Sequence, residues 1–386
     1  MRARFGRRLA GCAAGALCVG TASLVPAMPV HAAVHAAATK VTIVADHLDN
    51  PRGVSIGTGG RVLVAEAGNG DASGGRCAGV IDPESGIKTT MCLGFTGAVV
   101  AVQGTKVTKV LSNLPSVAAP SGFESSGPAF AVDVAGGKVA VVMQGVTTQP
   151  PASWKPWATT TFDHVLLNAT PEAPLNLGAY EKAHDPAHDG VASDPYSEAT
   201  SGAGTTGVVA DAGANDALLW KNGTLSTLAV FPPQREPMPG GGTTMQQSVP
   251  TSVVALPDGS YLVGELTGYP YVAGSARIWR VVPGHAPTVW KAGFTNIVGL
   301  ARASDGSIYV SELTTHGLLQ ASSNASGGLF RIAPNGTKTQ IPVAGLKYTG
   351  GVAAAADGSI YIANCSVGLS NSSSPCRGQL LKVSVS

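Results

Sequence analysis

Apolar and polar positions alternate along this chain in short runs that recur at a long interval. Three of these runs share nearly the same pattern, at residues 250–265, 297–312 and 350–364. In each, a small apolar run precedes an Asp-Gly pair, and a β-branched or aromatic run follows it and ends in a polar residue. An Asp-Gly pair between two such runs predicts a β-hairpin, because Gly adopts positive φ without steric cost. The pairs begin at residues 258, 305 and 357, so the repeat is 47 and then 52 residues long.

Three less regular copies come earlier in the chain. Residues 53–66 and 129–142 give the first two, and residues 208–211 keep the second strand of a third. Two further strand-like runs lie between copies, for example at 276–282 and 288–292, which makes four strands in each unit. A period near 50 residues with a β pattern is typical of propeller blades. The sequence therefore predicts an all-β fold, a six-bladed β-propeller of four-stranded blades.

The two ends of the chain supply the strands that this arrangement lacks. After the last hairpin only one strand remains, at 379–385, so the last blade is one strand short. One spare strand, at 41–45, precedes the first unit. Because open sheet edges promote aggregation and closure removes them, we predict that the N-terminal strand joins the C-terminal blade.

The first 32 residues have the pattern of a secretory signal peptide. Arginines at positions 2, 4, 7 and 8 precede an apolar stretch at 9–28, and Val30-His31-Ala32 suits a cleavage site. A membrane anchor is the alternative, but Gly, Ser, Thr and Pro interrupt the apolar stretch. We therefore expect an exported protein without a membrane span in the mature chain.

The rest of the chain has little charge. Removal of residues 1–32 takes away four arginines and no acids, so the net charge changes from +2 to −2. Nothing basic remains to suggest nucleic acid as a partner. Charged residues are 12% and glycines 50 of 386, which suits a turn-rich all-β protein. We expect residues 33–39 to be a short extension, residues 40–386 to form one propeller domain, and the protein to be a monomer.

Four cysteines lie outside the signal peptide, and three pairings are possible in principle. We predict the two local pairings, Cys77 with Cys92 and Cys365 with Cys376, each within one loop between a second and a third strand. Zinc is the competing interpretation, but the sequence has no Cys-x-x-Cys spacing and an exported protein meets oxidising conditions.

The two faces of the predicted propeller differ in their loops. One face has the tight Asp-Gly and Gly-Gly turns, whereas the other has long and varied loops, at 67–96, 144–161, 183–201, 268–275, 314–327 and 365–378. Loops on a rigid scaffold carry function, and surface loops of this length are uncommon without a role. We therefore expect the functional site on the long-loop face.

A polar residue ends nearly every second strand, and these residues come from five different units: Glu66, Asp211, Glu265, Glu312 and Asn364. The four carboxylates, Glu66, Asp211, Glu265 and Glu312, would hold a Ca²⁺ ion if they converged near the axis, since Ca²⁺ takes oxygen ligands. In the alternative, each side chain accepts hydrogen bonds from backbone N–H groups of its own turn. Recurrence from unit to unit favours a structural role.

Other polar and aromatic residues of this face are further candidates. Arg52 either binds an acid or bridges to Glu66, and Asp211-Ala-Gly-Ala-Asn215-Asp216 is the most polar corner. His184 and His188 lie four residues apart beside acids, but Pro186 between them argues against a helical metal site. Four aromatic residues lie in loops of this face and either stack on a ligand or pack the loops together: Trp154, Trp157, Tyr269 and Tyr271.

In its sequence the chain resembles the ScyD/ScyE family of exported propeller proteins, which is similar in pattern to NHL-type and TolB-like propellers. The likeness covers the mature chain and rests on several short segments taken together: 48–53, 64–68, 209–216, 228–232, 249–252, 264–270 and 292–297, the last containing Asn296. Asp194-Pro195-Tyr196 looks like the Asn-Pro-Tyr of the family, with Asp in place of Asn. Residues 197–206 replace the strand that follows, which predicts an irregular third blade. The family has no established catalytic activity that could be transferred.

Two hypotheses about function follow from the sequence. The first is a non-catalytic propeller that binds a small molecule, a glycan or a protein on its long-loop face. The second is a metal-dependent hydrolase or lactonase, or an oxidoreductase of the quinoprotein type, with a cation at the funnel. The sequence lacks a Gly-x-Ser-x-Gly motif, a phosphate loop, a dinucleotide fingerprint and a His-Glu-x-x-His motif, so it gives nucleophilic catalysis no support.

Overall fold

Antiparallel β-strands make up most of the chain in a computed structural model. The structure describes residues 39–71, 73–81, 88–147, 149–168, 170–200, 204–238, 241–367 and 377–385. These residues belong to one unit, Ala38–Ser386. The predicted signal peptide lies outside the described residues, as does the predicted extension except for its last residue, Thr39.

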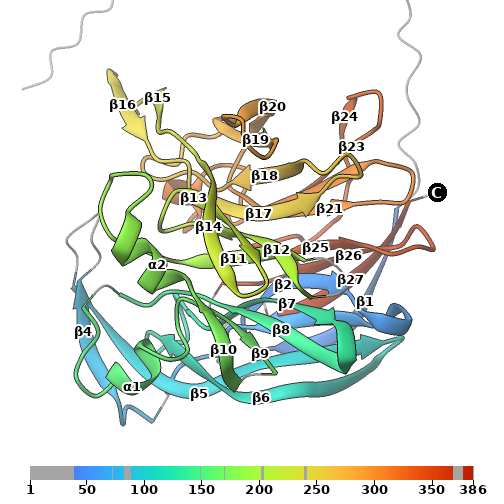
Figure 1. The fold of residues 1–386 in the computed structure, drawn as a ribbon. Helices are drawn as coiled ribbons and strands as arrows, with labels where there is room; N and C mark the ends of the chain where they lie inside the picture. The colour runs from blue at the N-terminus through green and yellow to red at the C-terminus, as the bar shows by residue number, and fades with distance from the viewer. Residues whose placement is uncertain are drawn as a thin grey trace, which may run out of the picture. The chain divides into compact units, whose positions relative to one another are not determined.

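The described strands form six sheets of four or five strands and one separate two-stranded hairpin (Figure 1). We number the six sheets as blades 1 to 6 in chain order and list the strands of each from the inner strand outward. Blade 1 consists of β2 (Pro51–Ile56), β3 (Val62–Glu66), β5 (Lys88–Gln103) and β6 (Lys106–Ala118), with β4 (Cys77–Ile81) paired to the start of β5. Blade 2 consists of β7 (Pro128–Val134), β8 (Lys138–Met143), β9 (His164–Leu167) and β10 (Thr170–Asn176).

Blades 3 to 5 follow the same order of strands. Blade 3 consists of β11 (Pro195–Thr200), β12 (Thr206–Asp211), β13 (Asp216–Lys221) and β14 (Thr224–Val230). The hairpin β15 (Gln234–Pro237) and β16 (Thr243–Gln246) comes next. Blade 4 consists of β17 (Pro250–Ala255), β18 (Tyr261–Glu265), β19 (Ala276–Val281) and β20 (Thr288–Phe294). Blade 5 consists of β21 (Ile297–Arg302), β22 (Ile308–Glu312), β23 (Gly328–Ile332) and β24 (Lys338–Gln340).

Blade 6 joins the two ends of the described chain. It consists of β25 (Val352–Ala354), β26 (Ile360–Asn364), β27 (Gly378–Val385) and, as its outer strand, β1 (Thr39–Leu48). Antiparallel pairing runs from Thr39 opposite Val385 to Leu48 opposite Gly378, and Figure 1 shows the blue β1 beside the red β27. The prediction that the N-terminal strand joins the C-terminal blade is confirmed.

The inner strands contact one another in sequence around an axis. Strand β2 contacts β7, β7 contacts β11, β11 contacts β17, β17 contacts β21, β21 contacts β25, and β25 contacts β2 again. This cycle is the arrangement that a propeller requires. The all-β propeller prediction is therefore confirmed.

An apolar cluster fills the space between each blade and the next. Leu63 of blade 1 packs with Val141 of blade 2, and the cluster between blades 6 and 1 includes Leu380. Four further clusters of the same kind lie between the remaining neighbours. Each blade is thus covered on both faces, which explains why the inner and second strands read as nearly continuous apolar runs.

Blade 3 is regular where the sequence predicted an irregular sheet. Strand β11 pairs with β12 from Pro195 opposite Asp211 to Thr200 opposite Gly207, with one register shift near Pro195. The prediction was wrong because Ser197 and Glu198 replace the usual apolar residues of an inner strand, so the strand has no apolar pattern to recognise. Their side chains are nevertheless buried in this blade.

The long loops contain local structure of their own. Cys77 and Cys92 form the predicted disulfide, and they lie opposite each other where β4 pairs with β5. Of the second predicted pair, Cys376 lies outside the described residues. Helix α1 (Lys155–Ala158) and the turns η1 (Thr58–Gly60), η2 (Ala135–Gly137) and η3 (Leu318–Gln320) are short, and α2 (Leu177–His184) is the longest helix of the described residues. None of the helices among the described residues is long and apolar enough to cross a membrane.

The cluster between blades 6 and 1 gives a direct test of ring closure. Leu380 of β27 has an exposed fraction of 0%, whereas Ile43 of β1 has 50%. We expect Leu380→Ala to lower the free energy of unfolding by about 2–5 kcal/mol, because it leaves a cavity beneath the closing strand. The control Ile43→Ala should change it by no more than about 0.5 kcal/mol. Chemical denaturation of both variants measures the difference, and equal losses would contradict this account of closure.

Candidate functional site

A cavity of about 420 Å³ runs along the axis of the propeller. All six inner strands line it, mainly with apolar side chains such as Val54, Phe130 and Leu300. Gly53 and Gly351 at the long-loop ends are buried, whereas Ala255 and Arg302 at the turn ends are exposed. This gradient indicates that solvent reaches the cavity from the tight-turn face, whereas the sequence led us to expect the functional site on the long-loop face.

Glu198 of β11 is the one acidic residue among those that line the cavity in the described chain. Its exposed fraction is 3%, and its Oε1 accepts a hydrogen bond from Nε1 of Trp220 at 3.0 Å. The indole reaches Glu198 across β12 because Gly207 stands between them, where a Cβ would lie 2.6 Å from Nε1. Oε2 of Glu198 is buried without a hydrogen-bond partner among the described residues.

Burial controls the charge of Glu198. Desolvation raises its pKa from 4.5 to about 7, although the hydrogen bond from Trp220 opposes this change. A carboxyl group with such a pKa is partly protonated near neutral pH, so it can donate or accept a proton there. Glu198 does not belong to any motif that repeats in the sequence. Its one distinguishing feature in the sequence is that it is an acid in an inner strand, where the other units have apolar residues.

The polar residues that end the second strands all make the same kind of hydrogen bond. Each accepts a hydrogen bond from the residue that lies 17 positions earlier in the chain, just before the inner strand of the same blade. The bonds are Asp49 N to Glu66 (2.8 Å), Asp194 N to Asp211 (2.6 Å), Ser248 Oγ to Glu265 (2.5 Å), Thr295 N to Glu312 (2.9 Å) and Lys347 N to Asn364 (2.8 Å). These side chains therefore fix the loop that enters their own blade, whereas the alternative interpretation expected the backbone N–H groups of their own turn, which only Asp211 among these five bonds as well, at Gly213 and Ala214.

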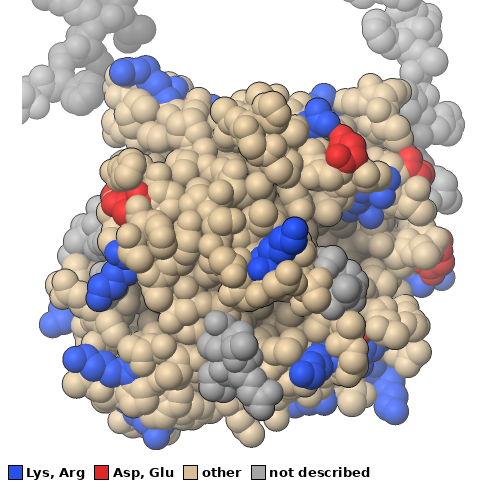
Figure 2. Space-filling model, in the orientation of Figure 1, with Lys and Arg blue, Asp and Glu red and all other residues tan. Residues whose placement is uncertain are grey.

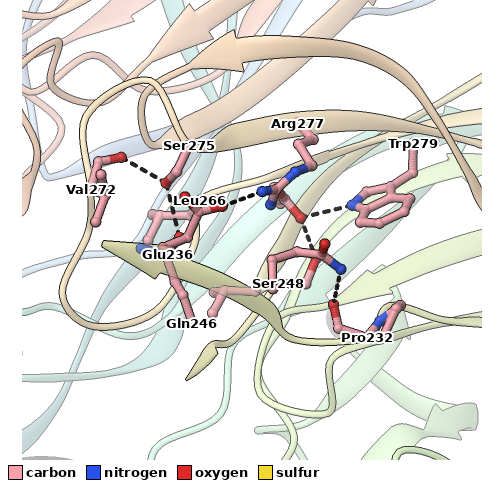
Figure 3. Close-up of polar contacts among 12 residues, drawn as sticks. Pro232, Glu236, Gln246, Ser248, Leu266, Val272, Ser275, Arg277 and Trp279 are labelled. Atoms are coloured by element: carbon pink, nitrogen blue, oxygen red, sulfur yellow. Dashed lines mark hydrogen bonds and ion pairs between the residues drawn. The ribbon is translucent and has the colours of Figure 1, made fainter. Parts of the chain in front are cut away.

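Glu265 has the most complete set of partners. Its two oxygens accept bonds from Ser248, from Nε1 of Trp279 at 2.7 Å and from Arg277 at 3.1 Å. Figure 3 shows Arg277, Trp279 and Ser248 converging on this point, and Arg277 also forms an ion pair with Glu236. With every oxygen satisfied, Glu265 has a structural role.

The four carboxylates predicted to share a Ca²⁺ ion do not come together. Glu66, Asp211, Glu265 and Glu312 are each held within their own blade, as the contacts above show. Within the described chain, no three His, Cys, Asp or Glu side chains form a group that could hold a metal ion as they stand. A cation shared by these four residues has no geometric support here.

Arg52 lies on the long-loop side of the inner strands and is 7% exposed. It donates a hydrogen bond to the carbonyl oxygen of Ser125 at 2.7 Å and also interacts with Tyr196 and Asp194. Burial raises the pKa of Asp194 to about 7, while Arg52 opposes that rise. The alternative bridge from Arg52 to Glu66 is not among the ion pairs of the described residues.

The aromatic candidates divide into two groups. Trp154 is 1% exposed and donates its Nε1 to the carbonyl oxygen of Arg76 at 2.9 Å. Trp157 packs edge-on against Phe95, with ring centroids 5.2 Å apart. Both tryptophans thus pack the loops together, whereas Tyr269 is 52% exposed.

Two asparagines connect neighbouring blades. Asn215 accepts a bond from the N–H of Val249 at 2.9 Å, and Asn296 donates to the carbonyl oxygen of Leu266 at 2.9 Å. Both have positive φ, 52° and 46°, which asparagine tolerates better than most residues. Among the residues that the structure describes, neither carboxylate oxygen of the candidate Asp216 has a hydrogen-bond partner.

Charged side chains are scattered over the face of the molecule that Figure 2 draws. On the face drawn in Figure 2, lysine and arginine side chains lie singly rather than in one patch. In the described chain, Arg302 forms no ion pair, although it is exposed at the turn end of the cavity.

Comparison with known proteins supports the fold. No family model matches the chain, and no curated protein matches it either. Among solved structures, a protein of unknown function from Bacteroides thetaiotaomicron VPI-5482 has a TM-score of 0.51 at 10% identity, covering 90% of this chain and 76% of that one. A streptogramin B lyase (TM-score 0.48, 12% identity, 90% and 98% coverage) and a glucose dehydrogenase (0.49, 12%, 90% and 100%) are also similar. At these identities the likeness concerns the fold alone.

Glu198 should give the stability of the protein a specific pH dependence. Because its folded-state pKa of about 7 lies above the ordinary 4.5, Glu198 stabilises the fold below pH 4.5, and this contribution is lost as the pH rises through 7. For Glu198 the loss is about 3 kcal/mol. We expect Glu198→Gln to retain the bond from Trp220 and to reduce the fall in the free energy of unfolding between these pH values by up to that amount.

Asp258 provides the matched control for this measurement. It is an exposed turn residue whose pKa is lowered to about 2, so it does not titrate in the same range. Asp258→Asn should therefore leave the pH dependence unchanged. Urea denaturation at a series of pH values compares the three proteins, and a Glu198→Gln curve parallel to the wild type would show that Glu198 is not protonated as described.

Proposed function

We propose that this protein binds a small apolar molecule with an acidic group in its axial cavity. The observation that carries the proposal is the cavity of about 420 Å³, which all six inner strands line mainly with apolar residues and which has Arg302 at its exposed end. Small-molecule sites in proteins are commonly about 300–1,000 Å³, mostly apolar, with a few polar groups that orient the ligand. The cavity fits this description better than it fits a glycan or a protein partner.

The polar groups of the cavity suggest how a ligand would be oriented. Arg302 at the exposed end can bind a carboxylate or sulfonate through charge-assisted hydrogen bonds. The apolar body of the ligand would then lie against Val54, Phe130 and Leu300.

An enzyme is the second candidate, and the pKa of Glu198 favours it. A buried carboxyl group that titrates near neutrality is suited to general acid–base catalysis, such as the opening of a lactone to an acid. This version does not need a cation at the funnel, which the described carboxylates do not offer as they stand. Both candidates place the same class of ligand in the same cavity.

We also propose that the chain is an exported member of the ScyD/ScyE family and that residues 1–32 are removed. The disulfide between Cys77 and Cys92 supports export, since structural disulfides persist in oxidising compartments. Mass spectrometry of the secreted protein tests the cleavage after Ala32.

Anilinonaphthalene sulfonate is a suitable probe, because it combines an apolar body with an acidic group. We expect one molecule to bind the folded protein with enhanced fluorescence. Arg302→Gln should weaken binding roughly tenfold, since charge-assisted hydrogen bonds contribute about 1.5–3 kcal/mol. Ala255→Trp should abolish binding, because Ala255 is an exposed lining residue and an indole there would fill the mouth.

Arg280 is the control, because it is a partly exposed arginine that pairs with Asp258 and does not line the cavity. Arg280→Gln should bind the probe as the wild type does. Equal binding by Ala255→Trp and wild type would show that the cavity is not the site. Dihydrocoumarin, an apolar lactone, then separates the two candidates: hydrolysis that is lost in Glu198→Gln indicates the enzyme, and none in the wild type indicates binding.

A further inference from the structure

Five carboxylates gather between helix α2 and the turn that joins β12 to β13. We call this group the α2 acidic cluster, and its members are Glu181, Asp185, Asp189, Asp211 and Asp216. Asp211 and Asp216 are fully buried, as is Glu181 of the helix, whereas Asp189 on the following loop is exposed. The cluster is separate from the axial cavity, whose lining includes none of its members.

The backbone brings like charges together in this cluster. Asp211 and Asp216 are directly opposite each other where β12 pairs with β13. Glu181 and Asp185 lie four residues apart at the end of α2, on the same side of the helix. Acids opposite each other in a sheet, or four apart on a helix, repel. Neighbouring acids accordingly add to the effect of burial in raising the pKa values of Glu181 and Asp216.

Several oxygens of the cluster have no partner. Both carboxylate oxygens of Glu181, both of Asp216 and Oδ1 of Asp185 are buried without a hydrogen bond among the described residues. Asp211 is different, since it accepts bonds from Ser193 and from the backbone N–H groups of residues 194, 213 and 214. A buried polar group without a partner costs free energy, and a buried charge costs more. Five such oxygens in one place need a counterpart.

No basic side chain supplies that counterpart. The ion pairs of the described residues include none with Glu181, Asp185, Asp189, Asp211 or Asp216. His184 and His188 on the same segment are exposed, and Nδ1 of His184 is bonded to the carbonyl oxygen of Tyr180. The atoms available to bind a metal ion in this cluster are therefore carboxylate oxygens, with no nitrogen or sulfur among them. Such a set suits a hard cation rather than zinc.

We propose that the α2 acidic cluster binds a single Ca²⁺ ion, with Glu181 and Asp216 as its principal ligands. An organic ammonium group is too large to reach oxygens that are fully buried, whereas a bare metal ion can reach them. Ca²⁺ also accepts irregular sets of six to eight oxygens, including carboxylates that bind through both oxygens. Mg²⁺ demands stricter octahedral geometry and keeps its water.

Binding requires a local closure of the cluster. No three of its side chains meet as a ready-made metal group in the described chain. Asp185 ends α2 in a left-handed conformation, and the exposed Asp189 accepts a hydrogen bond from Nδ2 of Asn215 at 2.9 Å. The ion would draw the loop at 185–189 towards Glu181 and Asp216. Hydrogen exchange in this loop should therefore slow when Ca²⁺ is added.

Isothermal titration with CaCl₂ on the full mature chain tests the proposal. We expect one ion per protein with a Kd below about 1 mM, the range of extracellular calcium modules, and weaker binding of Mg²⁺. Glu181→Gln and Asp216→Asn should each weaken Ca²⁺ binding at least tenfold. Asp185→Asn, at a partly exposed position where misfolding is less of a concern, should weaken it to a smaller degree.

Glu312→Gln is the matched control, because Glu312 is a buried carboxylate at the end of a second strand but lies outside the cluster. It should bind Ca²⁺ as the wild type does. Absence of Ca²⁺ binding by the folded wild type, or equal binding by Asp185→Asn and Asp216→Asn, would overturn the proposal. Neither result depends on the probe that tests the axial cavity, so the two proposals can fail separately.

Discussion

The pairing of β1 with β27 is the contact on which the rest of the structure depends. Each blade is apolar on both faces, so each needs a neighbour on both sides. A row of blades that did not close would leave one apolar face of the first blade and one of the last in water. The antiparallel register from Thr39 to Leu48 places blade 6 against blade 1 and covers both faces. Closure also sets the positions of the inner strands, and hence the cavity that they line.

The space between the blades of a closed propeller is filled with apolar side chains, so an unpaired charge there is costly. Most of the buried acids therefore have hydrogen-bond or ion-pair partners, as the complete set of partners around Glu265 shows. Acids without such partners lower stability at neutral pH, because they must either lose their protons in a buried place or hold them above their ordinary pKa. Glu198, Glu181 and Asp216 are such residues, and all three belong to blade 3 or to the helix before it.

The sequence predicts those parts of the structure that arise from local patterns. The Asp-Gly hairpins recur because each is formed by neighbouring residues, and the strand count at the two ends predicts the pairing of β1 with β27. The direction in which the cavity opens was not predictable, because it depends on the burial of Gly53 and Gly351 rather than on loop length. Glu198 was missed because its setting needs Gly207 and Trp220 from two other strands. The acidic cluster was missed because only the fold brings α2 to the turn between β12 and β13.

The repeats themselves show what is unusual in blade 3. The residue that ends each second strand fixes the entering loop in five blades, so this role is structural. In blades 1, 5 and 6 the residue opposite it on the third strand is Ala98, Gly328 or Gln379, none of them charged. In blade 4 the neighbouring Arg277 neutralises Glu265. Blade 3 instead places Asp216 opposite Asp211. Structure alone gives no reason for a second acid at a position that an uncharged residue or an arginine fills in those four blades, whereas a cation bound between α2 and this turn does.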